Sequence, residues 1–144
     1  MYFMLLFKRI LKGKRQNVFY NADNLPKCTL LIAAYNEENF ISEKIKNTLA
    51  LEYPDGKLEI IFITDGSTDR TPDILREYPE IKLLHQNERK GKVAAMHRAQ
   101  AYVKTEIIIF TDANTLLNKD ALINISRHYA DEKIGAVAGE KRVH

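Results

Sequence analysis

The sequence predicts an α/β fold in which a mostly parallel sheet is sandwiched between helices. Two observations support this. Apolar runs of strand length alternate with amphipathic, helix-like segments from residue 28 onward, which is the pattern of strand–helix–strand units. The runs are also continuous rather than alternating, as in strands that are covered on both faces. With 144 residues, 45% of them apolar and 28% charged, one globular domain is expected over residues 28–144.

The first half of the domain contains two expected strand–helix pairs. CTLLIAA (28–34) is a solid apolar run and predicts a buried strand. The segment 35–53 predicts a helix with an apolar stripe, and Asn36 is its expected cap. LEIIFIT (58–64) predicts the second strand. TPDILREY (71–78) predicts a short helix, because proline fits the first turn of a helix.

The second half continues the alternation. IKLLHQ (81–86) and EIIIF (106–110) predict the third and fourth strands. A helix from Lys92 to about Val103 is expected between them, with Val93 on its inward face. The remaining expected elements are a helix capped by Asn118 and a fifth strand, IGAVAGE (134–140).

Residues 1–27 form an apolar and basic leader. They carry six basic residues and one acid, a net charge of +5, whereas the remainder carries sixteen basic and eighteen acidic residues, a net charge of −2. An apolar segment followed by basic residues is typical of the cytoplasmic end of a membrane helix. The alternatives are a truncated span, a short interfacial anchor and a merely sticky terminus. The leader therefore predicts a membrane-proximal segment and a cytoplasmic protein at the inner face of the cell membrane.

Composition also limits the partners. The slightly acidic body has no basic stripe with interleaved aromatic residues, which argues against nucleic-acid binding. The single cysteine, Cys28, lies in an apolar run and is expected to be a buried, inert thiol. A chain without a possible internal disulfide fits a reducing compartment.

Polar clusters follow three of the expected strands. They are Tyr35-Asn36-Glu37, Asp65-Gly66-Ser67 and Asp112-Ala113-Asn114. In open parallel sheets, ligands bind outside the carboxyl ends of the strands. The three clusters are therefore expected at one edge of the sheet, around a common ligand.

Asp112 and Asn114 are the candidate metal ligands. Two oxygen donors two residues apart, on a turn that leaves a strand, can face one divalent cation. Mg²⁺ and Mn²⁺ favour such oxygen ligands and commonly share the rest of their shell with phosphates and waters. The alternative is that Asp112 only stabilises the turn, as Asx residues often do.

The other two clusters and a basic loop fit a nucleotide diphosphate. Asp65 can accept hydrogen bonds from a base or a sugar, and Tyr35 offers a ring for stacking. Arg89, Lys90 and Lys92 lie at a helix start, where backbone N–H groups and lysines attract anions. Read alone, this loop could equally be a solvated basic surface. There is no Walker-type loop and no GxGxxG motif.

Five motifs in this order resemble the nucleotide-sugar-binding half of family 2 glycosyltransferases, which have the GT-A fold. The resemblance covers about residues 28–140 and leans toward membrane-associated polysaccharide synthases. The motifs are LLIAAYNEENFI, LEYPDGKLEIIFITDGSTDRTPDIL, NERKGKVAAMHRA, IIIFTDANT and IGAVAGE.

The resemblance implies a UDP-sugar donor, a Mg²⁺ or Mn²⁺ ion, and inverting transfer of a hexose-like sugar to a saccharide or lipid acceptor. It also implies a role for each matching residue. Tyr35 stacks near the uracil, Glu37 lies near the nucleoside and Asp65 binds the uracil edge. Lys92 lies near the base or diphosphate. The two DxD positions are Asp112, which binds ribose and metal, and Asn114, which binds metal.

Three departures from the family pattern matter. Thr64 replaces the first acid of the DDGS motif, and the neutral Asn114 replaces the last acid of DxD. The family's catalytic base belongs to a later motif that is not in these residues, so no catalytic residue is expected within the chain. The chain is therefore expected to be a fragment that binds donor and turns over little or nothing alone. The competing interpretations are a non-catalytic nucleotide-binding scaffold and a sugar-nucleotide pyrophosphorylase.

Overall fold

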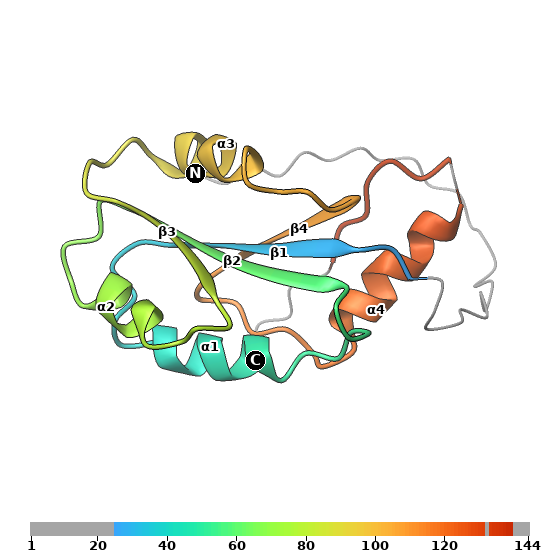
Figure 1. The fold of residues 1–144 in the computed structure, drawn as a ribbon, viewed down its shortest axis with the longest axis horizontal. Coiled ribbons are helices and arrows are strands. Elements are labelled where there is room, and N and C mark those ends of the chain that lie inside the picture. Colours follow the sequence, from blue (N-terminus) through green and yellow to red (C-terminus); the bar gives the residue numbers. More distant parts are fainter. Residues whose placement is uncertain (1–24, 132, 140–144) are drawn as a thin grey trace.

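The computed structural model describes residues 25–131 and 133–139, and its sheet is parallel, with helices on both faces (Figure 1). The α/β prediction is confirmed, and so are the first four predicted strands to within two residues. The elements are β1 (Cys28–Ala34), α1 (Ile41–Leu49), β2 (Leu58–Asp65), α2 (Thr71–Arg76), β3 (Lys82–Gln86), α3 (Lys92–Gln100), β4 (Ile107–Asp112), α4 (Ala121–Ser126) and the 3-10 helix η2 (Arg127–Ala130).

The strand order places three strand ends side by side. The described sheet has the order β3-β2-β1-β4, so the chain moves outward from β1 to β3 and then returns to the other side of β1. In the register, Ala34 pairs with Thr64 of β2 and Ala33 pairs with Asp112 of β4. A reversal of strand order of this kind opens a crevice at the carboxyl ends. Here that point lies between β1 and β4.

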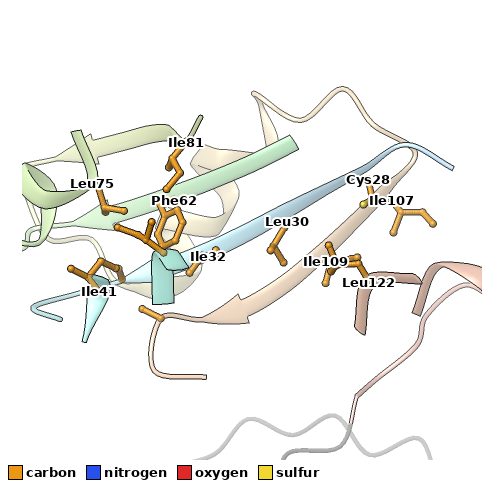
Figure 2. Packing of buried hydrophobic residues seen from close by; sticks show 13 residues of the cluster. Cys28, Leu30, Ile32, Ile41, Phe62, Leu75, Ile81, Ile107, Ile109 and Leu122 are labelled. Atoms are coloured by element: carbon orange, nitrogen blue, oxygen red, sulfur yellow. The ribbon is translucent and has the colours of Figure 1, made fainter. Parts of the chain in front are cut away.

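Two apolar layers hold the sheet. Below it in Figure 1 lie α1 and α2, and α4 lies at the lower right, whereas α3 lies above it. Successive residues of a strand point to opposite faces, so the continuous apolar runs supply both layers. The larger layer includes Leu30, Ile32, Ile41, Phe62, Leu75, Ile109 and Leu122 (Figure 2). The layer beneath α3 consists of Leu31, Ile61, Ile63, Ala95 and Ala99.

Four sequence expectations were wrong. Asn118 does not cap the last helix, because α4 begins at Ala121 and its N-cap position is Asp120. Asn36 does not cap a helix, because α1 begins only at Ile41; instead, its backbone is left-handed, with φ 52°. Val93 is 69% exposed, because α3 packs on the sheet through small alanines instead. Residues 134–139 form no strand, and none of their side chains is buried. That segment contains two glycines and only small or β-branched residues, so it offers little apolar surface to hold it on the sheet.

The predicted leader falls almost entirely on residues 1–24, which lie outside the described residues. Within the described part of the chain, each helix is too short or too polar to cross a membrane.

Candidate functional site

The six predicted site residues line one cavity of about 290 Å³ at the carboxyl ends of the strands. Loops after β1, β2 and β4 form its walls, together with the start of α3. We call it the strand-end cavity. The side chains that line it are those of Ala33, Ala34, Tyr35, Glu37, Ile63, Asp65, Arg89, Lys92, Ala95, Asp112, Ala113 and Asn114, with Gly91 contributing backbone. The three loops therefore converge at one edge of the sheet, as the sequence predicts.

Asp65 is the most buried polar group of this cavity, with 6% of its surface exposed. Its Oδ2 atom accepts hydrogen bonds from the backbone N–H groups of Lys90, at 2.8 Å, and Gly91, at 2.6 Å. Its Oδ1 atom is buried and has no hydrogen-bond partner among the described residues. A buried oxygen without a partner costs about 1–3 kcal/mol. A ligand N–H or O–H donor in the cavity would remove that cost.

The loop after β2 approaches the loop before α3 very closely. Gly66 has φ +71°, and a Cβ atom built on it would lie 2.6 Å from the Cβ of Arg89. Its N–H donates to the carbonyl oxygen of Gln86 at 2.8 Å. Glycine is therefore required here for space as well as for backbone conformation. This contact fixes the basic loop against the Asp65 side of the cavity.

Arg89 covers the ring of Tyr35. Its guanidinium carbon lies 4.0 Å from the ring centroid, and its Nη1 atom donates to the tyrosine hydroxyl at 3.2 Å. Tyr35 is still 39% exposed. A planar guanidinium on a ring is itself a stacking surface, so the two side chains form a platform beside Asp65. The sequence indicates a basic loop here but gives no sign that Arg89 pairs with Tyr35.

Asp112 and Lys92 form an ion pair at the opposite wall. Both side chains are about half exposed, at 50% and 57%, so the pair contributes little to stability. The ion pair matters for ligand binding, because the ammonium of Lys92 occupies the carboxylate that is the predicted metal ligand.

Asn114 lines the same cavity with an exposed side chain. No group of three histidine, cysteine or acidic side chains with the geometry of a metal site occurs in the described residues. The carboxylate of Asp112 and the amide oxygen of Asn114 are hard donors. They fit Mg²⁺ or Mn²⁺, provided that a ligand and waters complete the shell.

Glu37 lies in the loop after β1 and is partly buried. Its backbone N–H donates to Thr71 Oγ1 at 2.9 Å. Next to it, the Asn36 side chain accepts from the Thr68 N–H at 2.8 Å. Asp69 accepts from the Glu38 N–H at 3.0 Å. These hydrogen bonds tie the loop after β1 to the loop after β2.

Two residues of α1 contact the loop after β4, and neither is among the residues that the sequence predicts for the site. Lys44 is fully buried, and its ammonium donates to the carbonyl oxygen of Thr115. Burial lowers its pKa to about 8, and the negative charge of Asp112 acts in the opposite direction. Asn47 binds both backbone groups of Leu117, at 2.8 and 2.9 Å. One sequence signal was available, since Lys44 lies between the apolar positions 41 and 45 of the helix stripe.

The family profile described as "Glycosyl transferase family 2" matches residues 29–144. Two curated relatives are similar over most of this chain. The beta-monoglucosyldiacylglycerol synthase of Nostoc sp. is 36% identical, over 83% of this chain and 27% of its own length. The poly-beta-1,6-N-acetyl-D-glucosamine synthase of Staphylococcus aureus is 34% identical, over 85% of this chain and 30% of its own length. The chain thus spans less than a third of these relatives.

Solved structures agree with the fold. A mannosyltransferase from Pyrobaculum calidifontis, in complex with GDP-Man and Mn²⁺, has a TM-score of 0.80 and 34% identity. The match covers 90% of this chain and 39% of that one. TarS of S. aureus in complex with UDP-GlcNAc has a TM-score of 0.66 and 24% identity, over 74% of this chain and 31% of that one. The motifs, the parallel sheet and the profile match agree, and the chain belongs to glycosyltransferase family 2.

Proposed function

We propose that this chain is the donor-binding part of an inverting glycosyltransferase. It binds a UDP-sugar with a divalent cation, for transfer of the sugar to a hydroxyl of a saccharide or lipid acceptor. The observation that carries the proposal is the buried, unpartnered Oδ1 of Asp65, a residue that lines the same cavity as Asp112 and Asn114. An unsatisfied acceptor at one wall and two oxygen donors at another fit the two ends of a nucleoside diphosphate.

The state of the Asp65 carboxylate favours uracil as the base. Its Oδ2 atom is already used by two backbone N–H groups, so only Oδ1 is free for a ligand. Uracil offers one N–H on its pairing edge, whereas guanine offers an N–H and an amino group that match two carboxylate oxygens. The similar structures contain both GDP-Man and UDP-GlcNAc, and the single free oxygen of Asp65 supports the uridine donor for this chain.

The other cavity residues serve the sugar diphosphate. The platform of Tyr35 and Arg89 stacks on the base. Asp112 and Asn114 hold the cation, and Lys92 binds a diphosphate oxygen. A bound cation supplies charge stabilisation for the departing diphosphate. Glu37 lies near the nucleoside, so all the acids of the cavity have donor roles in this proposal. The base that deprotonates the acceptor lies outside it.

The acceptor and the location follow from the relatives and the leader. The two curated relatives are named as synthases of a glycolipid and of a polysaccharide, so both a lipid and a saccharide acceptor are compatible with the proposal. The apolar and basic leader supports a position at the inner face of the cell membrane. Membership of a transferase family favours transfer over the pyrophosphorylase alternative.

The test is calorimetric titration of UDP with Mn²⁺ into the wild type and the Asp112→Ala variant. The wild type is expected to bind, and the variant to bind at least about tenfold more weakly, a factor that corresponds to 1.4 kcal/mol. Asp55→Ala is the matched control, because Asp55 is exposed and precedes β2, at the opposite edge of the sheet. UDP-sugar hydrolysis and transfer by this chain are expected to be little or none. If millimolar UDP produces no heat with the wild type, the donor site is not there.

A further inference from the structure

Helix α1 holds the loop that carries the candidate cation ligands. Lys44 and Asn47 are three residues apart and therefore lie on the same side of the helix. Lys44 donates to the carbonyl oxygen of Thr115, and Asn47 both donates to and accepts from the backbone of Leu117. These contacts begin one residue after Asn114 and join parts of the chain that are 70 and 71 residues apart. We call the pair the α1 clamp.

The clamped loop is held by backbone hydrogen bonds mainly at its two ends. Residues 113–120 form only turns and irregular structure between β4 and α4. At its start, Ala113 N–H donates to the backbone carbonyl oxygen of Ala33 at 3.1 Å, and Thr115 N–H donates to the backbone carbonyl oxygen of Asp112 at 3.2 Å. Near its end, Glu52 N–H donates to the carbonyl oxygen of Lys119 at 2.8 Å. Between these points, the α1 clamp provides the side-chain hydrogen bonds to the loop backbone. The course of the chain directly after Asn114 therefore depends on the α1 clamp.

Stability alone does not account for a lysine at this position. Lys44 is fully buried beside apolar neighbours, including Ile41 and Ile45. Burying an ammonium has a desolvation cost that a packed apolar side chain would not have. What the ammonium adds is a charge-assisted hydrogen bond to one carbonyl oxygen, which is stronger and more directional than a neutral contact. Its effect is to fix the course of the loop.

We propose that Lys44 and Asn47 are positioning residues for cation binding at Asp112 and Asn114. The inference rests on the proposed function, because it concerns the same cavity. The α1 clamp holds the turn so that the carboxylate and amide oxygens face one point. Neither clamp residue touches the cation or the donor. Their loss is expected to weaken the cation-dependent part of UDP binding and to leave the base-dependent part at Asp65 unchanged.

The experiment measures UDP affinity by calorimetry twice for each protein, once with Mn²⁺ and once with EDTA. The variants are Lys44→Met, which removes the donor with little change of volume, and Asn47→Ala. Each is expected to lose about tenfold or more of the affinity gained from Mn²⁺, the size of effect seen when groups that orient metal ligands are removed. Affinity in EDTA is expected to stay within about twofold of wild type, since stacking and the Asp65 hydrogen bond remain. Paramagnetic resonance of free Mn²⁺ in the presence of UDP gives an independent measure of ion affinity.

Two controls come from the same helix. Lys46→Met makes the same chemical change at an exposed position. Ile45→Val removes one buried methylene beside Lys44 without touching the loop, so it lowers the melting temperature but leaves the Mn²⁺-dependent gain intact. If Lys44→Met does not fold, Asn47→Ala decides the question, because Asn47 is only partly buried.

The outcomes separate this inference from the proposed function. If the folded clamp variants keep the wild-type increase in UDP affinity with Mn²⁺, the inference is wrong and the proposed function still stands. Equal losses in Mn²⁺ and in EDTA also overturn it, because they show a general structural role. A wild type that binds no UDP overturns the proposed function and this inference with it.

Discussion

At the scale of single residues, Asp65 shows how one carboxylate can have two tasks. Its Oδ2 atom holds the start of α3 through the N–H groups of Lys90 and Gly91. Its Oδ1 atom remains without a partner in the described structure. The two backbone hydrogen bonds to Oδ2 restrict rotation of the carboxylate and so also fix the position of Oδ1. An unsatisfied buried acceptor calls for an explanation, and a ligand donor that binds in the cavity supplies one.

Replacing Asp65 by asparagine tests which base this oxygen recognises. The amide oxygen can keep the bonds to Lys90 and Gly91, while the amide nitrogen now points into the cavity as a donor. UDP affinity is expected to fall about 10- to 100-fold, the value of a charge-assisted hydrogen bond. The affinity for CDP relative to UDP is expected to rise, because cytosine presents an acceptor where uracil presents an N–H.

Calorimetry with both nucleotides measures this ratio, and Asp73→Asn, at an exposed position on α2, is the matched control. An unchanged CDP-to-UDP ratio would mean that Asp65 does not read the base.

At the scale of elements, the site depends on how loops fit against one another. The strand ends are fixed by the sheet register, but the walls of the cavity are built by loops that brace each other. One of these contacts, between Gly66 after β2 and Arg89 before α3, leaves no room for a side chain at position 66. Through it, the position of α3 is coupled to the Tyr35 platform and to the Asp65 hydrogen bonds.

The Gly66→Ala variant tests that fit. Its Cβ would lie 2.6–2.9 Å from three atoms of Arg89, so the loop must move in addition to the cost of a left-handed alanine, about 1–2 kcal/mol. The free energy of unfolding is expected to fall by about 1–3 kcal/mol more than that conformational cost, and UDP binding is expected to weaken. Chemical denaturation and calorimetry measure the two effects.

Gly56→Ala provides the matched control. Gly56 has nearly the same backbone angle, φ +72°, but among the described residues beyond its two chain neighbours no atom lies within 4 Å of a Cβ built on it. This variant is expected to lose only the conformational term and to bind UDP normally. Equal stability losses in the two variants would show that Arg89 does not prevent a side chain at position 66.

At the scale of the whole molecule, β1 is the central element, paired with β2 on one side and β4 on the other. Cys28 begins this strand and is fully buried. Burial raises the pKa of its thiol to about 11, and a hydrogen bond with Tyr53 acts against that shift. The reactive thiolate is therefore rare at pH 8, about one molecule in a thousand, and it is also inaccessible.

Labelling of Cys28 with a thiol reagent at pH 8 is therefore expected to report global unfolding. Under native conditions the labelling rate should be limited by global unfolding of the sheet. In urea the labelling reaction should be complete within the mixing time of a manual experiment. Rapid stoichiometric labelling of the native protein would show that the first strand opens on its own.

Much of this fold could be predicted from the sequence, because its information is local. Continuous apolar runs predict buried parallel strands, and Asp65 and Asp112 could be placed in the site since each ends such a run. What could not be predicted are contacts between distant residues. Arg89 on Tyr35 joins positions 54 residues apart, and Lys44 holds Thr115 across 71. The segment 134–139 was wrongly predicted as a strand because an apolar pattern does not say whether a partner strand is there.

The ion pair of Lys92 and Asp112 has a consequence for how the proposed ligands arrive. A cation that binds the carboxylate of Asp112 must displace the ammonium of Lys92. The displaced ammonium then lacks an anionic partner. A pyrophosphate group supplies one, so the dication and the nucleotide each lower the free energy of binding for the other. Such coupling is reciprocal by thermodynamic necessity. Sodium or potassium ions carry a single charge and do not bring a nucleotide pyrophosphate with them. They are therefore expected to compete poorly with Lys92 for the carboxylate of Asp112.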